Sequence, residues 1–480
     1  MTAVIPRTKR RFVRWRSAPF ILIAAAVGTF VGLAVALNDA RELTLLLIAI
    51  VGAIVAPHRR WLAALAILLM FISPVLIPPL AEMNGITIRI IDVVALLLVG
   101  HTLARVFLRV EQPSLTASAR RIFGVSSILL LYVGMTLIMP MMRMPDHFPL
   151  AAISYARLVS SFALGIVIYL LLHHSEDFVW LRRIIIAAAF MNGLVAIFQW
   201  LRIGSEFLIH LSLRVDGLLG PDGLGLVGAT LLVLSLSVRQ DTATRRQRWA
   251  EKVGVSVGLL MLLLAKSASA IAAAGGGVAL FIFLTRSPRL TRKRLITSIL
   301  ALAGGLAAIL ALRWPDIVGL LKLSGGSFAH RLVVGYAAWL VFLQHPLFGV
   351  GWQTSWAPDV IANPEVSFQV RLHLGGLPAV LLPEENPTSV HNFYLQLLAE
   401  LGVVGGALFA ILVIIMIGEC RKLLRSNSPV VRAVTIHWTV ILVMLAIWLN
   451  TNPLFGGQMA AYLLFLAFAA IGAASRLARA

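Results

Sequence analysis

The sequence predicts an all-α integral membrane protein that crosses the bilayer many times. Of its 480 residues, 60% are hydrophobic and only 13% are charged, a balance that a water-soluble globular protein of this size does not keep. Apolar stretches of about 20 residues, the length that crosses a bilayer, recur from 18–37 to 458–474. We count about 12 to 14 of them, because the runs at 43–56 and 253–265 are short.

Positive charge indicates which connections lie on which side of the membrane. The formal net charge is +21, and the basic residues gather in alternate connections. These basic runs are 7–16, 59–60, 120–121, 182–183, 239–252, 286–294 and 421–432. By the positive-inside rule they are cytoplasmic, which puts both termini in the cytoplasm and makes the first run a retained tail. Because no soluble module concentrates the charge, we expect membrane lipids and no nucleic acid as partners.

The connection from 313 to 399 is far longer than the usual helix–helix connection in a bundle. We therefore divide the chain into membrane helices at 1–312, a large periplasmic loop at 313–399 and further membrane helices at 400–480. Within the loop, apolar residues recur at helical spacing over 328–343. The sequence thus predicts a folded, partly helical cap.

Two helices of this cap are predicted, with a break between them. Pro346 ends the first helix, and the glycines of 347–351 then make a turn. A second helix is expected from Val390, with a hydroxyl of 388–389 as its cap. His391 is then expected in the first turn, where free backbone N–H groups and the positive end of the helix dipole favour an anionic ligand.

The residues around His391 resemble a known family. His391-Asn392, followed after nine residues by Gly402-Val403-Val404-Gly405, looks like the signature of the O-antigen ligase and O-antigen polymerase superfamily of bacterial membrane glycosyltransferases. Upstream, Arg331, Trp339 and the stretch 346–351 are similar to the pattern that opens the same loop in that family.

A third stretch, in an earlier external loop, adds to this resemblance. The segment from Arg214 to Leu218, with Gly220-Pro221-Asp222 after it, resembles the family's Arg-x-x-x-Leu and Gly-x-x-Pro-Asn pattern. Here Asp222 departs from the family's usual asparagine. The likeness covers roughly Arg202 to Gly405, with the three motifs in order and all in external loops.

The resemblance implies a GT-C-like membrane enzyme at the periplasmic face of the bacterial inner membrane. Such an enzyme transfers a whole glycan from an undecaprenyl diphosphate carrier to an acceptor hydroxyl. The acceptor is another lipid-linked glycan in O-antigen or exopolysaccharide polymerisation, and a lipid A core in ligation. The span count and the long loop favour polymerisation only weakly, so both reactions stay open.

Three side chains carry this chemistry in our interpretation. Arg214 and Arg331 each offer a charged fork of donors that matches phosphate oxygens, so we expect them to hold the diphosphate and stabilise it as it leaves. An imidazole is ordinarily suited to accept a proton at neutral pH, so we interpret His391 as the general base for the acceptor hydroxyl or as the group that orients the acceptor, with Asn392 as a hydrogen-bond partner. The alternatives are that the arginines extend to lipid headgroups and that His391 only caps its helix.

Three further residues are expected near the substrate. The resemblance implies a basic residue beside a serine at the 266–269 hairpin, which makes Lys266 a third cation for the diphosphate. Arg157, inside a predicted span, either binds the diphosphate too or pairs with Asp92. Glu400 is expected to orient a loop arginine rather than to react itself.

We expect neither a metal nor a cofactor. The external carboxylates at 39–42 and 384–385 lack convincing ligand spacing, and no phosphate-binding glycine loop is found. Two other classes of function stay open. A polysaccharide flippase or other transporter would need a charged central cavity and no long capped loop, whereas in a non-catalytic assembly subunit the loop would be a docking surface.

Overall fold

The computed structural model shows an all-α membrane bundle. It describes residues 59–71, 81–83, 86–88, 91, 94–95, 97–100, 102, 115–204, 214–215, 217–238, 244–286, 327–355, 357, 360, 363–374, 390–454 and 458–479. Among these residues, seven helices are long and apolar enough to cross a membrane, and three shorter helices are also apolar. The predicted fold class is therefore confirmed. Several predicted spans, including 18–37, lie outside the described residues.

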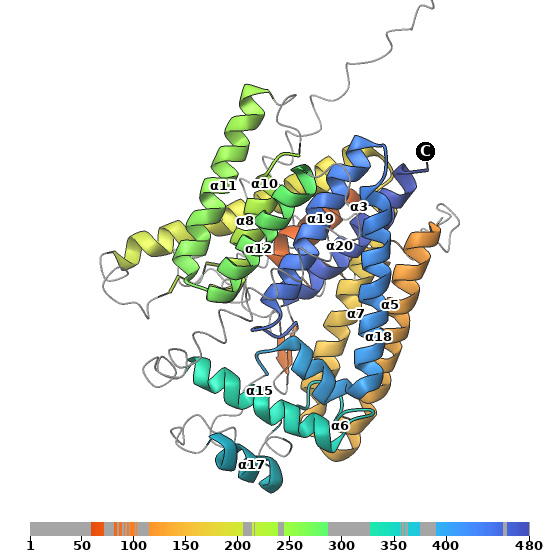
Figure 1. Cartoon of the computed structure of the whole chain (residues 1–480), viewed down its shortest axis with the longest axis vertical. Helices are drawn as coiled ribbons and strands as arrows, with labels where there is room; N and C mark the ends of the chain where they lie inside the picture. Colours follow the sequence, from red (N-terminus) through yellow and green to blue (C-terminus); the bar gives the residue numbers. More distant parts are fainter. Residues whose placement is uncertain are drawn as a thin grey trace, which may run out of the picture.

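Helices make up nearly all of the described secondary structure (Figure 1). In chain order they are α3 (Arg59–Met70), α5 (Ala117–Thr136), α6 (Ile138–Arg143), α7 (Phe148–Leu171), α8 (Ser175–Ile203), α10 (Gly220–Ser235), α11 (Arg245–Ala265), α12 (Ala268–Arg286), α15 (Ser327–Gln344), α17 (Pro364–Leu374), α18 (Phe393–Leu424), α19 (Pro429–Trp448) and α20 (Gln458–Leu477). α6 continues α5, and the two count as one span. One short antiparallel hairpin, β1 (Ala81–Met83) and β2 (Ile86–Ile88), falls where the charge pattern predicts an external loop.

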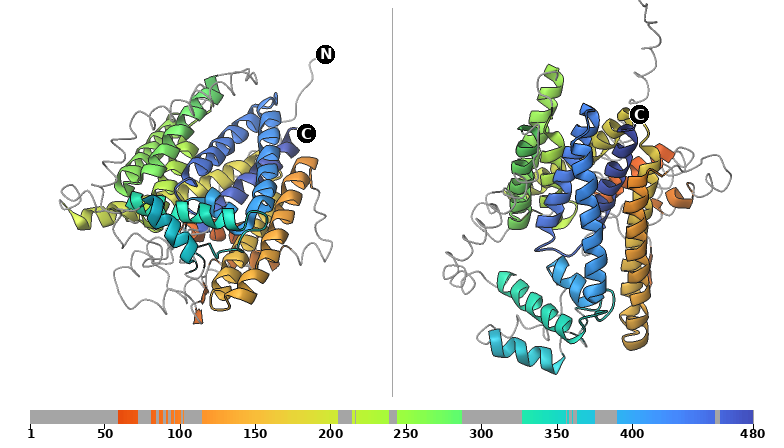
Figure 2. Two further views of the ribbon diagram at one scale, coloured as in Figure 1. Left: turned by 60° about the horizontal axis from the view of Figure 1, so that its bottom comes forward. Right: turned by 45° about the vertical axis from the view of Figure 1, so that its right-hand side comes forward.

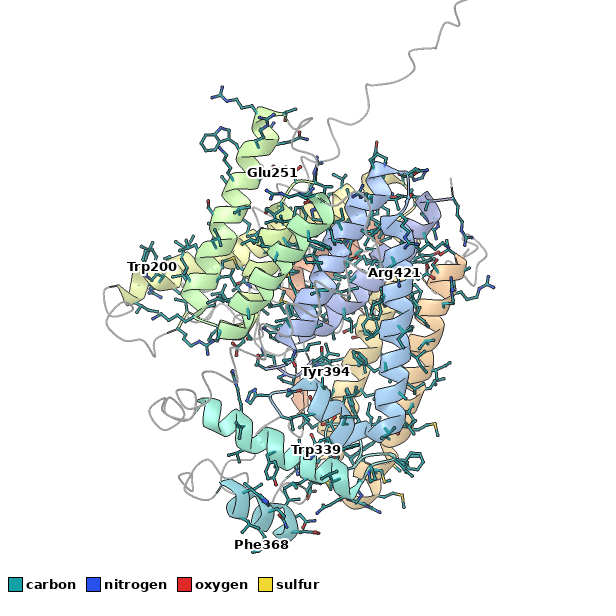
Figure 3. All side chains as sticks on the ribbon, viewed as in Figure 1. Trp200, Glu251, Trp339, Phe368, Tyr394 and Arg421 are labelled. Carbon is teal, nitrogen blue, oxygen red and sulfur yellow. The ribbon has the colours of Figure 1, made fainter. Side chains whose placement is uncertain are left out.

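Residues of three predicted cytoplasmic basic runs, 59–60, 120–121 and 421–432, lie at one end of the bundle, which we call the basic end. There Arg60 at the start of α3 pairs with Asp177 at the start of α8, at 2.6 Å. Arg121 at the start of α5 pairs with Glu419 near the end of α18, also at 2.6 Å. The labelled Arg421 lies on this side in Figure 3. The described connections therefore alternate between the two ends as the charge pattern predicts.

At the opposite end, part of the long loop folds into the predicted helical cap. α15 lies across this end of the bundle and α17 lies beyond it, as Figure 1 and the right-hand view of Figure 2 both show. Apolar side chains of the two helices, including Val334, Val341 and Val366, form a core separate from that of the bundle. Trp339 and Phe368, labelled in Figure 3, are exposed on α15 and α17.

The short helix α10 packs very closely on α11. A Cβ added at Gly228 of α10 would lie 2.9 Å from the carbonyl oxygen of Gly258 on α11, and a Cβ added at Gly258 would lie 2.8 Å from that of Gly228. Facing small residues let two membrane helices approach without a side chain between them. The start of α10 is thereby fixed next to the corner between α11 and α12.

α18 is bent at Gly402, where the backbone has φ 62° and ψ −165° instead of helical values. The part after the bend, 403–424, is about 33 Å long at a rise of about 1.5 Å per residue. This length is close to the roughly 30 Å of bilayer hydrocarbon. The bend therefore separates a part long enough to span the membrane from a start that lies with the cap. The division at 399/400 stays a prediction.

A set of backbone hydrogen bonds joins the loop to α18 at this bend. The Val350 N–H donates to the Ala399 carbonyl at 3.0 Å, and the Val403 N–H donates to the Pro346 carbonyl at 2.8 Å. We call this contact between 346–351 and α18 the clasp. A bend frees helix N–H and carbonyl groups, and in a membrane protein these groups need partners within the protein. The clasp supplies those partners.

Two glycines make the clasp possible. Gly349, with φ 69°, and Gly402 both have positive φ, which L side chains rarely adopt. A Cβ at Gly349 would collide with the backbone of Glu400, and one at Gly402 with that of Leu347. The fully buried Glu400 carboxylate also accepts a hydrogen bond from the Ser355 hydroxyl at 2.7 Å. In the described structure Glu400 therefore holds the loop in place, instead of orienting an arginine as the sequence analysis expects.

Replacing Gly402 by alanine is expected to destabilise the protein by more than about 1 kcal/mol, because the side chain requires a strained backbone and meets the loop backbone. Gly418→Ala is the matched control, since Gly418 lies in the same helix with open space around its Cα. Thermal unfolding of the purified variants in detergent measures the difference. Equal melting of Gly402→Ala, Gly418→Ala and the native protein would contradict the clasp.

Candidate functional site

Two of the predicted site arginines meet at one carboxylate. Arg214, just before α10, places Nη2 3.0 Å from Oδ1 of Asp222. Arg331, near the start of α15, places Nη2 3.6 Å from the other oxygen, Oδ2. The side chains of Arg214, Arg331 and Asp222 are 32%, 27% and 30% exposed. We call Arg214 and Arg331 the arginine pair; it lies at the cap end and is partly exposed.

Asp222 is held by the corner between α11 and α12. The Ser267 hydroxyl donates to Asp222 Oδ1 at 2.6 Å, and Arg214 Nε donates to the Ala265 carbonyl at 3.0 Å. Burial alone would raise the pKa of Asp222, but the Ser267 hydroxyl and the arginine pair outweigh it, so this pKa lies below its ordinary value. The stabilisation from the ionised carboxylate is full above the ordinary pKa and is lost as the pH falls through the lowered one.

Lys266 lies at the same corner, directly before Ser267. Its backbone has φ 45° and ψ 35°, the left-handed conformation that ends α11 and turns the chain into α12. The predicted hairpin is therefore confirmed as a tight turn between two helices. Its place in the chain keeps Lys266 beside the residue that bonds Asp222.

Two polar residues of α8 hold the loop that carries Arg214. The Leu218 N–H donates to Asn192 Oδ1 at 3.0 Å, and the Gln199 amide exchanges two hydrogen bonds with the Gly217 backbone, at 2.8 and 3.0 Å. Asn192 is fully buried. Neither residue was singled out from the sequence. A carboxamide inside an apolar span is costly unless it is paired, and this is the signal that could have found them.

A chain of hydrogen bonds leads from Asp222 to the end of α19. The hydroxyls of Ser267 and Ser269 lie 3.1 Å apart, and Asn452 Nδ2 donates to the Ser269 hydroxyl at 3.1 Å. Asn452 also donates to the Trp448 carbonyl at 3.1 Å. We call Ser267, Ser269 and Asn452 the polar relay. The polar relay connects Asp222, which lies between the arginines, to the end of α19.

The end of α19 also holds the start of α18, and with it the segment of His391. The Phe393 N–H donates to the Leu449 carbonyl at 3.0 Å, and the Tyr394 hydroxyl donates to the Ala446 carbonyl at 2.9 Å. His391 is half-buried and lies two residues before Phe393. Figure 3 shows Tyr394 between the bundle and the cap. The end of α19 thus connects the segment of His391 to the polar relay.

The start of α18 differs from the prediction in one detail. The helix begins at Phe393, and Asn392 is its N-cap, with Oδ1 accepting hydrogen bonds from the N–H groups of Tyr394 and Leu395 at 3.0 and 3.1 Å. The expected start at Val390 is therefore wrong, and His391 precedes the helix instead of lying in its first turn. Asparagine is among the best N-caps because its side-chain oxygen reaches these free donors. The capping residues expected from the sequence lie outside the described part of the chain.

Arg157 lies on a different set of helices. It is half-buried in α7, which packs mainly on α20, whereas the arginine pair lies beside α10 and α15. Its expected partner Asp92 is outside the described residues. A role for Arg157 at the diphosphate stays a prediction.

An apolar pocket lies between α5, α7, α18 and α20. Its lining includes Val133, Leu158, Phe393, Leu412 and Phe468. Phe393 belongs to the start of α18 and Leu412 to its membrane part, so the pocket passes the bend. The cavity is small, with a volume of about 40 Å³, and its lining is almost entirely apolar.

Clusters of side chains that could bind a metal were sought in the part of the chain that the structure describes. Within it, no group of three or more His, Cys, Asp or Glu side chains could hold a metal ion. The carboxylates considered from the sequence, at 39–42 and 384–385, are outside the described residues.

Substitutions at Asn392 separate capping from substrate binding. Asn392→Ser keeps a capping oxygen, so we expect near-native stability, whereas Asn392→Ala is expected to lose about 1 kcal/mol. If capping is the main role, Asn392→Ser also keeps transfer activity. Thermal unfolding and product formation, measured on the same preparations, test this. Loss of activity in a fully stable Asn392→Ser variant would show instead that the amide contacts substrate.

The chain matches a known family over part of its length. Residues 253–410 match the sequence model of a family described as O-antigen ligase. This region contains Lys266, Arg331, His391 and the bend of α18, while Arg214 and Asp222 lie before it. A search of curated proteins found no match. The match supports a glycosyltransferase-like enzyme and confirms the resemblance stated above. We conclude that the chain is a multi-pass membrane protein whose residues 253–410 are similar to the O-antigen ligase family.

Proposed function

We propose that this protein transfers a glycan from an undecaprenyl diphosphate carrier to an acceptor hydroxyl, at the periplasmic face of the bacterial inner membrane. The observation that carries the proposal is the arginine pair, because two guanidinium groups from loops far apart in the sequence lie around one point. This point is at the cap end, opposite the basic end. With the basic end in the cytoplasm, both termini are cytoplasmic and the cap is periplasmic.

The arginine pair binds the diphosphate in this proposal. Each guanidinium donates two parallel hydrogen bonds to phosphate oxygens. Lys266, at the neighbouring corner, adds a third cation. Negative charge grows on the diphosphate as it leaves the sugar, and fixed cations stabilise this charge more in the transition state than in the substrate.

His391 acts on the acceptor. The acceptor oxygen forms a bond to the anomeric carbon while the bond from that carbon to the phosphate oxygen breaks. The proton of the acceptor hydroxyl passes to His391, and undecaprenyl diphosphate leaves with the bonding electron pair. Asn392 caps the helix that begins just after His391. Its role is therefore to hold the segment of His391 in position. Because the donor is already activated, the transfer needs no ATP, and we propose that it needs no metal.

Both candidate acceptors are linked to lipid, so the membrane holds them at the level of the cap. A growing glycan in polymerisation and a lipid A core in ligation both offer a hydroxyl there. The proposal therefore covers both reactions, with Arg157 and the half-buried parts of α7 as further candidates for substrate contact.

The direct test uses the full chain reconstituted in vesicles with undecaprenyl-diphosphate-linked repeat units, with and without acceptor lipid, in buffer that contains EDTA. Sizing the glycan and its lipid separates the outcomes. Longer glycans without acceptor lipid indicate polymerisation, and glycan moved onto the acceptor indicates ligation. Absence of both products, together with unchanged donor, would overturn the proposed function. Activity that requires an added divalent ion would overturn the metal-independent step.

In the same assay, His391→Ala is expected to lower the rate of transfer by about 100-fold to 10,000-fold, the usual contribution of a general base. His373→Ala is the matched control, because His373 is an exposed histidine of the same cap whose Nδ1 contacts the Gln369 carbonyl. It should keep the native rate. If His391→Ala inserts normally and transfers glycan at the rate of His373→Ala, His391 is not the base.

A further inference from the structure

The anion site between the arginines is already filled by the protein's own carboxylate. Asp222 directs Oδ1 to Arg214 and Oδ2 to Arg331, at 3.0 and 3.6 Å. Two oxygens on one centre, each facing one guanidinium, reproduce the way in which a phosphate group meets two arginines. A bound phosphate and the Asp222 carboxylate would therefore use the same N–H donors.

The Asp222 carboxylate is also held firmly enough to compete with a phosphate group for the arginine pair. Its Oδ1 accepts a hydrogen bond from the Ser267 hydroxyl at 2.6 Å, and Ser267 is almost fully buried and belongs to the polar relay. At the same time, about a third of each charged side chain is exposed. A ligand from outside can thus reach the guanidinium groups and take the place of the carboxylate.

We propose that Asp222 is an internal counter-anion, which occupies the arginine pair in the empty protein and must be displaced when a diphosphate binds. This inference rests on the proposed function, which assigns the diphosphate to the arginine pair.

The counter-anion has a direct consequence for turnover. Two uncompensated arginines would hold the diphosphate product as firmly as the substrate. An internal carboxylate that returns to the arginines as the product leaves weakens both complexes and speeds release. It also offsets the repulsion between the two guanidinium groups in the empty protein. Asp222 is therefore a residue that sets affinity, acting on the arginines and not on the reacting atoms.

The experiment measures binding of inorganic diphosphate to the full-length protein in detergent, by isothermal titration at low salt. Asp222→Asn keeps the shape of the side chain and removes the charge, so we expect the dissociation constant to fall by about threefold to tenfold. The matched control is Asp146→Asn, because Asp146 is an exposed carboxylate in the turn before α7 at the same end of the bundle. It should bind as the native protein does.

Two further variants make the result specific. Arg331→Ala combined with Asp222→Asn should lose the gain in affinity, because the gain acts through the arginine pair. Ser267→Ala leaves all three charges and removes the hydroxyl that anchors Asp222, so it should tighten diphosphate binding by a smaller factor. If Asp222→Asn does not give a monodisperse protein, Ser267→Ala alone tests the inference.

The outcomes separate this inference from the proposed function. Equal or weaker diphosphate binding by Asp222→Asn, in a protein that still transfers glycan, overturns the counter-anion and leaves the transferase in place. Failure of every variant to bind diphosphate, together with no glycan transfer, overturns the proposed function and the inference with it. Tighter binding that persists without Arg331 also overturns the inference, because the carboxylate would then act elsewhere.

Discussion

The clasp at Gly402 is the constraint on which the rest of the cap depends. A bend in a membrane helix leaves backbone groups without helical partners, and the 346–351 turn supplies them through hydrogen bonds to both sides of the bend. The two chains approach so closely that only glycine fits at Gly349 and Gly402. A loop that would otherwise be free above the bilayer is thereby fixed to a long membrane helix.

The candidate site follows from this attachment. α15 ends at the clasp and carries Arg331 near its other end, while the start of α18, held by the end of α19, carries His391. The remaining arginine comes from a loop fixed by α8. Arg214 and Arg331 then meet at Asp222, where the cost of leaving water is limited because each of the three side chains stays about one-third exposed. The backbone contacts of the clasp and of α8 thus position the site, and the charges of its two arginines suit it to an anion.

Patterns with a simple physical cause could be predicted from the sequence. Apolar length and basic runs gave the membrane class and the alternation of the ends, and Pro346 with its following glycines marked the end of α15. The convergence of Arg214 and Arg331 was expected only from motif order. Asp222 as their shared partner could not be predicted, because it depends on contacts between residues far apart in the chain. The same holds for Asn192 and Asn452, whose partners are backbone groups and hydroxyls of other elements.

At the start of α18, Asn392 replaced the expected cap because several neighbouring residues have capping side chains, and tertiary contacts decide among them.

The central claim is that the start of α10, with the loop before it, and the start of α15 form one site. Cysteine pairs in a Cys420→Ser background test it most directly, because Cys420 is the only native cysteine and is buried. A short bifunctional thiol reagent should link Asp222→Cys to Arg331→Cys. It should not link Asp222→Cys to His345→Cys, which directly follows α15 and lies about 21 Å from Arg331 along the axis of that helix. Links in both pairs, or in neither while all introduced thiols react, would contradict the site.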